Sequence, residues 1–192
     1  MPMNVDQAIH ARRSVRSFTP RVVDESTIVA LLRAAVQAPS AMNAQPWLFA
    51  VIQDRTELKR YSDRAKEMIA RERGRRDPSA RLSDAMIHDD AFNIFYDAGT
   101  LVVVCAREDT PQANADCWLA AENLMLAACD LGLGTCVVGF AVPVLNTREV
   151  KRELAIPEGG AAVAPIVVGY PSGAPADVAR SEPHITSWSP HR

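Results

Sequence analysis

The sequence predicts one domain in which helices pack around a single β-sheet. Its 192 residues suffice for one domain with a core of its own. Hydrophobic residues make up 48% and charged residues 23%, as in ordinary globular proteins. Segments with the helical period alternate along the chain with short apolar runs, and neither internal repeats nor a linker divide them.

Two helices and a strand come first. A short helix is expected over Asn4–Arg13, where Asn4 and Gln7 have capping-box spacing. A second begins at Asp24, carries an apolar stripe with helical spacing and stops before Pro39. The apolar run Leu48–Ile52 predicts a buried strand.

The middle of the chain contains one predicted helix, one predicted strand and, between them, residues 77–98, whose secondary structure the sequence does not predict. A helix is predicted over Glu57–Arg73, ended by Gly74. The aromatic residues within 77–98 indicate a helical or irregular segment, which either covers a pocket as a lid or makes a plain core contact. The apolar run Leu101–Cys105 then predicts a central strand.

The second half begins with the longest predicted helix, Ala113–Leu131. It is apolar on nearly every face, which is typical of a helix at a domain centre or in a subunit interface. A strand over Cys136–Phe140 and a helix opened by Asn146 follow. Ala161–Val168 is the last predicted strand, and Pro165 within it indicates an edge position or a bulge.

Composition excludes several classes of protein. A net charge of −2 offers no broad basic surface for nucleic acid or an anionic membrane. No apolar run is long enough to span a bilayer, and the first residues lack the pattern of a signal peptide, so a cytoplasmic protein is expected. The proline-rich tail lacks periodicity and is expected to be disordered or to extend along another surface.

Cysteine and histidine offer no metal site. The four cysteines have apolar neighbours and no C-x-x-C pairing, which is typical of buried thiols in a reducing compartment, and the four histidines lack ligand spacing. We therefore expect no metal.

Two polar stretches are candidates for ligand binding. Residues 12–16, Arg-Arg-Ser-Val-Arg, could grip a phosphate through charge-assisted hydrogen bonds, although a solvated basic turn has the same composition. Residues 38–47 contain two prolines and three uncharged polar side chains (Ser40, Asn43 and Gln45). These suit the polar edge of a planar ligand or a sugar-like chain, but they equally suit a turn that satisfies its own backbone.

Common catalytic and nucleotide motifs are absent. Gly132 and Gly134 follow a helix and precede a strand, the reverse of the order in a dinucleotide-binding fingerprint. Neither a P-loop, a nucleophile elbow nor an H-E-x-x-H motif occurs, and no catalytic side chain is assigned.

In combination and in order, several stretches resemble the FMN-dependent nitroreductase family. They are Arg12–Arg16, Pro39–Trp47, Asp97-Ala98, Ala121–Ala128, Leu131–Cys136 and Gly169–Pro171. The resemblance covers nearly the whole chain except residues 60–95. It implies an α+β fold with a mainly antiparallel central sheet flanked by helices, assembled as an intertwined homodimer. Residues 1–170 would form the FMN-binding domain and 171–192 an arm that contacts the partner subunit.

The resemblance also implies a binding site at the dimer interface, with each FMN touched by both subunits. The FMN phosphate and ribityl chain would be held by Arg12, Arg13, Ser14 and Arg16, with Arg180 completing the phosphate site. Flavin contacts, some from the neighbouring subunit, would come from Pro39, Ser40, Asn43 and Gln45, and the isoalloxazine would be lined by Val137, Val138 and Gly139.

The implied activity is hydride transfer from NADH or NADPH through FMN to a nitroaromatic, a quinone or another activated acceptor. The cofactor carries this chemistry, and a nicotinamide that stacks on flavin needs no Rossmann motif. Two alternatives stay open: the same fold acting on a dedicated non-nitro substrate, or an FMN-binding protein that stores the cofactor without useful turnover.

Overall fold

A four-stranded antiparallel sheet forms the middle layer of the protein. The computed structural model describes residues 2–73, 86 and 88–189. The strand order is β1-β2-β4-β3, and every pairing is antiparallel, which confirms the expected sheet. The strands are β1 (Trp47–Ile52), β2 (Thr100–Ala106), β3 (Gly134–Val137) and β4 (Ala161–Gly169).

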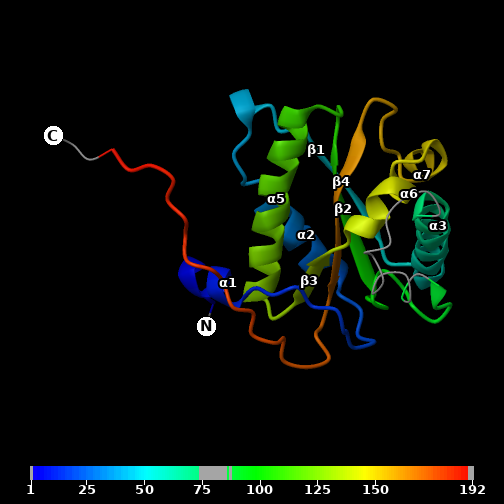
Figure 1. Ribbon diagram of the computed structural model, residues 1–192, viewed down its shortest axis with the longest axis horizontal. Helices are drawn as coiled ribbons and strands as arrows, with labels where there is room; N and C mark the ends of the chain where they lie inside the picture. The colour runs from blue at the N-terminus through cyan, green and yellow to red at the C-terminus, as the bar shows by residue number, and fades with distance from the viewer. Residues whose placement is uncertain (1, 74–85, 87, 190–192) are drawn as a thin grey trace.

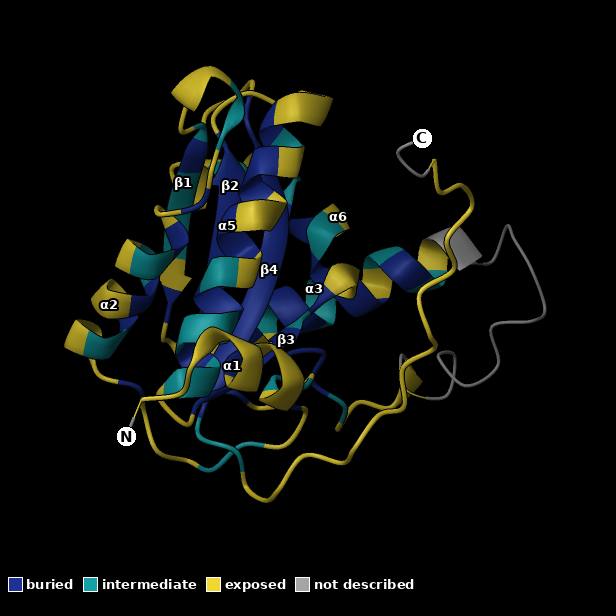
Figure 2. Ribbon diagram, turned by 90° about the vertical axis from the view of Figure 1, so that its left-hand side faces the viewer, coloured by how far each residue is buried: buried dark blue, intermediate teal, exposed yellow. Residues whose placement is uncertain are grey.

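Helices cover both faces of the sheet (Figure 1). One face carries α1 (Val5–Ala11), α2 (Glu25–Ala35) and α5 (Pro111–Asp130), and the other α3 (Arg55–Arg73), α6 (Val142–Leu145) and α7 (Arg148–Glu153). Alternate residues of β2 enter the two cores: Val102 and Val104 face α5, whereas Leu101 and Val103 face the layer of α3. Figure 2 shows β2 and β4 buried between these layers.

Local capping sets the helix starts, as the sequence predicts. Asn4 accepts from the amide of Gln7 while the Gln7 side chain accepts from the amide of Asn4, which completes the capping box. Asp24 caps α2 through the amide of Thr27. α1 ends at Ala11, two residues earlier than predicted, because Arg12 already has an extended ψ of 128°.

Two predictions around β3 are wrong. The strand predicted over Cys136–Phe140 stops at Val137, and Gly139–Ala141 form a 3₁₀ turn into α6, which was not predicted. Asn146 does not cap the following helix, because Thr147 occupies that position. The Asn146 amide instead bonds the backbone of Ala162 in both directions, at 2.9 Å each.

Pro165 is predicted to mark an edge position or a bulge, and because β4 is a central strand the structure selects the bulge. A bulge does lie beside it: the register with β2 shifts between Ala164 and Ala162, which leaves Val163 as the extra residue. The Pro165 carbonyl accepts from the amide of Val138 at 2.8 Å. In an antiparallel strand the amide and the carbonyl of one residue point to the same neighbouring strand. Because the Pro165 carbonyl points toward the end of β3, the N–H that proline lacks would also point there, so no hydrogen bond to β2 is lost.

The segment that the sequence left unassigned lies partly outside the described residues, as does the helix end predicted at Gly74. Its described part is irregular and makes a core contact, because Ile94 and Phe95 are buried. The ammonium of Lys66, itself buried, donates to the carbonyls of Asp89 and Phe92 and ties this segment to α3. None of the helices in the described ranges is both long and apolar enough to cross a membrane.

Candidate functional site

The arginine segment that follows α1 runs beside β3. Ser14 forms an isolated bridge with Thr135, and the amide of Val15 donates to the Thr135 carbonyl at 2.9 Å. Val15 packs directly over Gly134, where an added Cβ would lie 2.7 Å from the Val15 Cβ. Only glycine permits this approach, so Gly134 lets Ser14 and Arg16 lie against the sheet.

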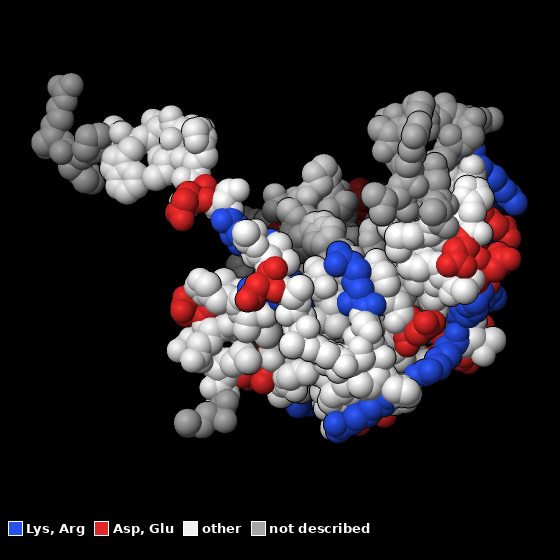
Figure 3. Space-filling view, turned by 60° about the horizontal axis from the view of Figure 1, so that its bottom comes forward, with Lys and Arg blue, Asp and Glu red and all other residues white. Residues whose placement is uncertain are grey.

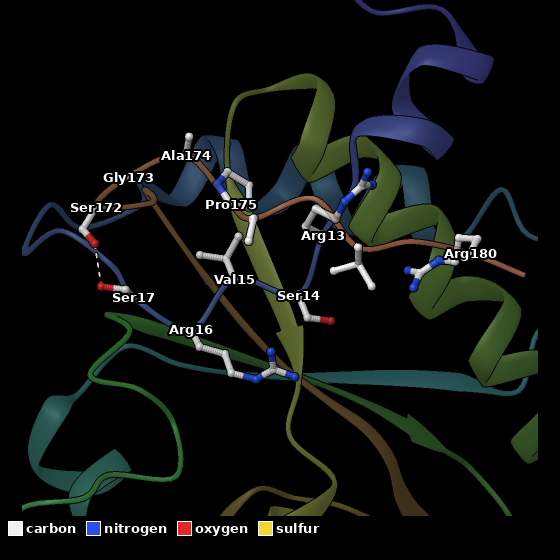
Figure 4. A pocket seen from close by; sticks show the side chains of 12 residues that line it. Arg13, Ser14, Val15, Arg16, Ser17, Ser172, Gly173, Ala174, Pro175 and Arg180 are labelled. Atoms are coloured by element: carbon white, nitrogen blue, oxygen red, sulfur yellow. Dashed lines mark hydrogen bonds between the residues drawn. The ribbon is translucent and has the colours of Figure 1, made fainter.

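This segment and the start of the tail enclose a pocket of about 540 Å³ (Figure 4). Among the described residues that line it, the charged ones are Arg13, Arg16 and Arg180, and none is acidic. In Figure 4 the hydroxyl of Ser14 lies between the guanidinium groups of Arg16 and Arg180. The excess of cations is local, because acidic and basic side chains are interspersed over the face in Figure 3.

The three guanidinium groups differ in their existing partners. Arg13 donates to the carbonyls of His10 and Arg12, and its Nη2 lies 3.5 Å from a carboxylate oxygen of the exposed Asp177. The Nε of Arg13 is buried and has no hydrogen-bond partner. Arg16 forms no ion pair with any described residue and lies 6.0 Å from the centre of the Tyr96 ring.

These features fit a phosphate monoester. Such a group is dianionic and rich in acceptors, and it is bound best by guanidinium forks and hydroxyl donors. The pocket offers the guanidinium groups of Arg16 and Arg180 and the Ser14 hydroxyl, whereas the Arg13 guanidinium points toward α1 in Figure 4, donates to the carbonyls of His10 and Arg12, and contributes its positive charge. Arg12 does not line the pocket; its Nε lies 3.5 Å from an Oε1 of Glu122 on α5.

The residues predicted to line the flavin ring sit where β3 ends, beside the arginine segment. Val137 is half-buried and Gly139 is exposed, but Val138 is buried in the core, so a ligand could reach only its backbone. Burial raises the pKa of the neighbouring Cys136 thiol, an effect that Arg16 and Ser14 partly oppose. Cys136 is therefore a neutral core side chain.

The polar loop at residues 39–45 has an unusual, well-bonded backbone. Met42, Asn43 and Gln45 all have left-handed φ values, of 53°, 54° and 46°. The amide of Gln45 donates to Ser40 Oγ at 3.0 Å, and its side chain donates to Asn43 Oδ1 at 3.1 Å. The loop thus satisfies part of its own polarity, as the turn interpretation expects, yet Asn43 and Gln45 stay exposed.

One chain does not bring the two groups of predicted residues together. The loop is bonded to α5 at Asp116, near the start of the helix, whereas the residues that lead into α1 are bonded at Asp130, its last residue. Those fourteen residues correspond to about 21 Å of helix at 1.5 Å per residue. Figure 1 shows the loop and α1 at opposite ends of α5.

The tail contributes more to the pocket than the sequence indicates. Ser172 bonds Ser17 both through the hydroxyls, at 2.5 Å, and through its amide, and Gly173–Ala176 form one wall. No pattern in the proline-rich segment predicts this contact. The available signals were the motif Gly169–Pro171 before it and the family resemblance, which assigned Arg180 in the tail to the phosphate site.

Comparisons with known proteins agree with this geometry. The family model described as "Nitroreductase family" matches residues 9–170. A protein of Archaeoglobus fulgidus, provisionally named an NADH dehydrogenase/NAD(P)H nitroreductase, is 31% identical over 85% of this chain and 83% of its own length. The iodotyrosine deiodinase of Thermotoga neapolitana is 29% identical over 83% of this chain and 84% of its own.

A solved structure shares the whole architecture. The nitroreductase with bound FMN from Bacteroides fragilis superposes with a TM-score of 0.81 at 26% identity, covering 98% of this chain and all of that one.

Proposed function

Because this chain belongs to the nitroreductase family, we propose that it is an FMN-dependent oxidoreductase that passes hydride from NADH or NADPH to a nitroaromatic, a quinone or another activated acceptor. Bound FMN supplies the redox chemistry in such an enzyme, and the protein supplies binding, orientation and electrostatics. The observation that carries the proposal is the pocket whose described lining residues include Arg13, Arg16, Arg180 and Ser14 and no acidic residue.

The chain's own residues take distinct binding roles in this proposal. Arg13, Arg16 and Arg180 hold the phosphate, and the Ser14 hydroxyl donates to it. Arg12 lies outside the pocket beside Glu122, and its role at the ribityl chain rests on the family resemblance alone. The end of β3, Val137–Gly139, offers backbone and small side chains to the ring.

The loop residues Pro39, Ser40, Asn43 and Gln45 reach the ring from a second copy of the chain. About 21 Å of helix separates their anchor from that of α1 within one chain, which supports this arrangement. A homodimer would also cover Trp118 and Leu119 on α5, which are nearly half exposed in one chain. The tail carries Trp188, 76% exposed, and is the arm that contacts the partner.

We also place the protein in the cytoplasm. All four cysteines are free thiols and three of them are buried, as is usual in a reducing compartment.

The first experiment is the absorbance spectrum of purified, desalted protein, with the released flavin identified. We expect about one FMN per chain. A colourless protein that also fails to bind added FMN would contradict the proposal. Rapid anaerobic reduction of the bound flavin by NADH or NADPH then tests the activity, and reduction by dithionite alone would count against it.

A dedicated non-nitro substrate is the second candidate, favoured by the likeness to an iodotyrosine deiodinase. Steady-state comparison of nitroaromatic, quinone and halogenated phenol acceptors separates the two. If reduced protein fails to pass electrons to any of them, flavin storage becomes the better description.

A further inference from the structure

Asp116 is a buried carboxylate that the proposed binding roles do not use. It is the sixth residue of α5 and is 3% exposed. Its two oxygens lie 3.3 and 3.2 Å from the amide nitrogen of Ala41, and the side-chain amide of Gln112 donates to one of them at 3.3 Å. Within the described part of the chain Asp116 has no cationic partner.

A buried carboxyl group with only neutral donors needs a physical reason. Removing a carboxylate from water is costly unless hydrogen bonds or opposite charges compensate, and an apolar side chain would fill the same space without that cost. Of the two groups that donate to Asp116, the side chain of Gln112 is exposed and can bond water instead, so what Asp116 adds over an apolar side chain is an acceptor for the loop amide at Ala41. The reason for the carboxylate therefore lies in the loop.

That loop is held in a conformation that ordinary residues avoid. Three of its non-glycine residues are left-handed, beginning with Met42, directly after Ala41. Such backbone persists only where surrounding contacts over-determine it. The bonds from Gln45 to Ser40 and Asn43 fix the internal shape, and the bond from Ala41 to Asp116 fixes the turn on α5.

We infer that Asp116 is a positioning residue for the flavin ring: by accepting from Ala41 it holds the turn that presents Ser40, Asn43 and Gln45. This inference rests on the proposed function, because the loop's target is the bound flavin. Asp116 acts through the loop and touches neither phosphate nor ring.

The test removes each end of this hydrogen bond separately in the FMN-loaded protein. Asp116→Ala removes the acceptor. Ala41→Pro removes the donor, and the extended Ser40 before it (φ −141°, ψ 151°) accepts a following proline. Each variant is expected to lose about 100-fold in kcat/KM for quinone reduction, since a misplacement of about 1 Å has that effect. The double variant loses no more than either single one, because both remove one interaction.

Three further readouts distinguish positioning from general damage. FMN content stays unchanged because the arginine pocket is intact, whereas the visible circular dichroism of the flavin changes. Hydrogen exchange at the Ala41 amide accelerates in Asp116→Ala. Asp116→Asn keeps an acceptor oxygen and is expected to retain most of the activity. Asp109→Ala is the control: it loses only a bond to Asn114 in the first turn of α5 and should behave as the parent.

The inference would be overturned if Asp116→Ala kept the kcat/KM and the flavin dichroism of the parent. It would also be overturned if the losses in kcat/KM multiplied in the double variant, or if Asp116→Asn were as impaired as Asp116→Ala. If Asp116→Ala does not fold, fully active Ala41→Pro overturns it equally. A parent protein that holds no FMN contradicts the proposed function instead. The exchange rate of the Ala41 amide still tests the anchor in that case.

Discussion

Truncating Arg16 tests the phosphate site most directly. Arg16 lines the pocket and forms no ion pair with any described residue, so Arg16→Ala loses only its contacts with the Tyr96 ring and the Cys136 thiol. A hydrogen bond between charged groups contributes about 1.5–3 kcal/mol. Loss of one such hydrogen bond between Arg16 and the phosphate should weaken FMN binding by about 10- to 150-fold, at 1.4 kcal/mol per factor of ten.

The assay titrates apoprotein with FMN and, separately, with riboflavin, which lacks the phosphate. Flavin fluorescence gives both dissociation constants at one ionic strength. Arg16→Ala is expected to weaken FMN binding and to leave riboflavin binding unchanged, so that the preference for FMN over riboflavin falls by the same factor.

Arg21→Ala is the matched control. It removes the same charge, but Arg21 stacks over Tyr170 at 3.9 Å and does not line the pocket. Its FMN affinity should stay close to that of the parent, because screening weakens distant surface charges. Unchanged FMN affinity in Arg16→Ala would refute the phosphate assignment, as would a riboflavin affinity that falls as much as the FMN affinity. If Arg21→Ala weakens FMN binding as much as Arg16→Ala does, the effect of both variants is one of net charge.

Three other perturbations probe the assembly, the packing and the pH response. Mixing equal amounts of chains that carry Arg16→Ala and chains that carry Asn43→Ala, with subunit exchange, should recover about a quarter of the parent activity, since about half of the dimers are then mixed and one of the two sites in a mixed C2 dimer is intact; no recovery in steady-state assays would place both residues in the same chain's site. Gly134→Ala should weaken FMN binding because its Cβ would lie 2.7 Å from that of Val15, and adding Val15→Gly, which removes the opposing Cβ, should restore binding in the same titration, whereas failure of that rescue would contradict the packing argument. Hydrogen bonds from Ser26 and Thr27 lower the pKa of Asp24 to about 2 from 3.8, so its charge stabilises the fold above pH 4 and this contribution is lost as the pH falls through about 2. Asp24→Asn keeps the cap but should flatten this part of the stability curve in urea titrations, and an unaltered pH dependence would contradict the assignment.

Local features of the chain were predictable because they depend on neighbours in sequence. The caps at Asn4 and Asp24 and the apolar stripe of α2 require only residues three or four positions apart. The errors occur where a long-range contact overrides local preference. β3 ends early because its next pairing position meets Pro165, and Asn146 bonds Ala162 of β4 instead of capping a helix.

The binding residues divide in the same way. The basic segment at residues 12–16 and the polar loop at 39–45 were identifiable by composition, and their order along the chain indicated the family. Composition could not place the tail against the arginine segment, nor show that Asp116 bonds the loop. Those contacts join residues 75 or more positions apart.

The sequence by itself determined the elements, their capping and the chemical types of the candidate ligands, because these follow from short-range periodicity and side-chain chemistry. Only the tertiary structure decided the strand order, the bonds between Ser17 and Ser172 that hold the tail on the arginine segment, and the separation of the two residue groups along α5. The physical reason is that strand pairing and packing join segments whose spacing along the chain leaves no local pattern.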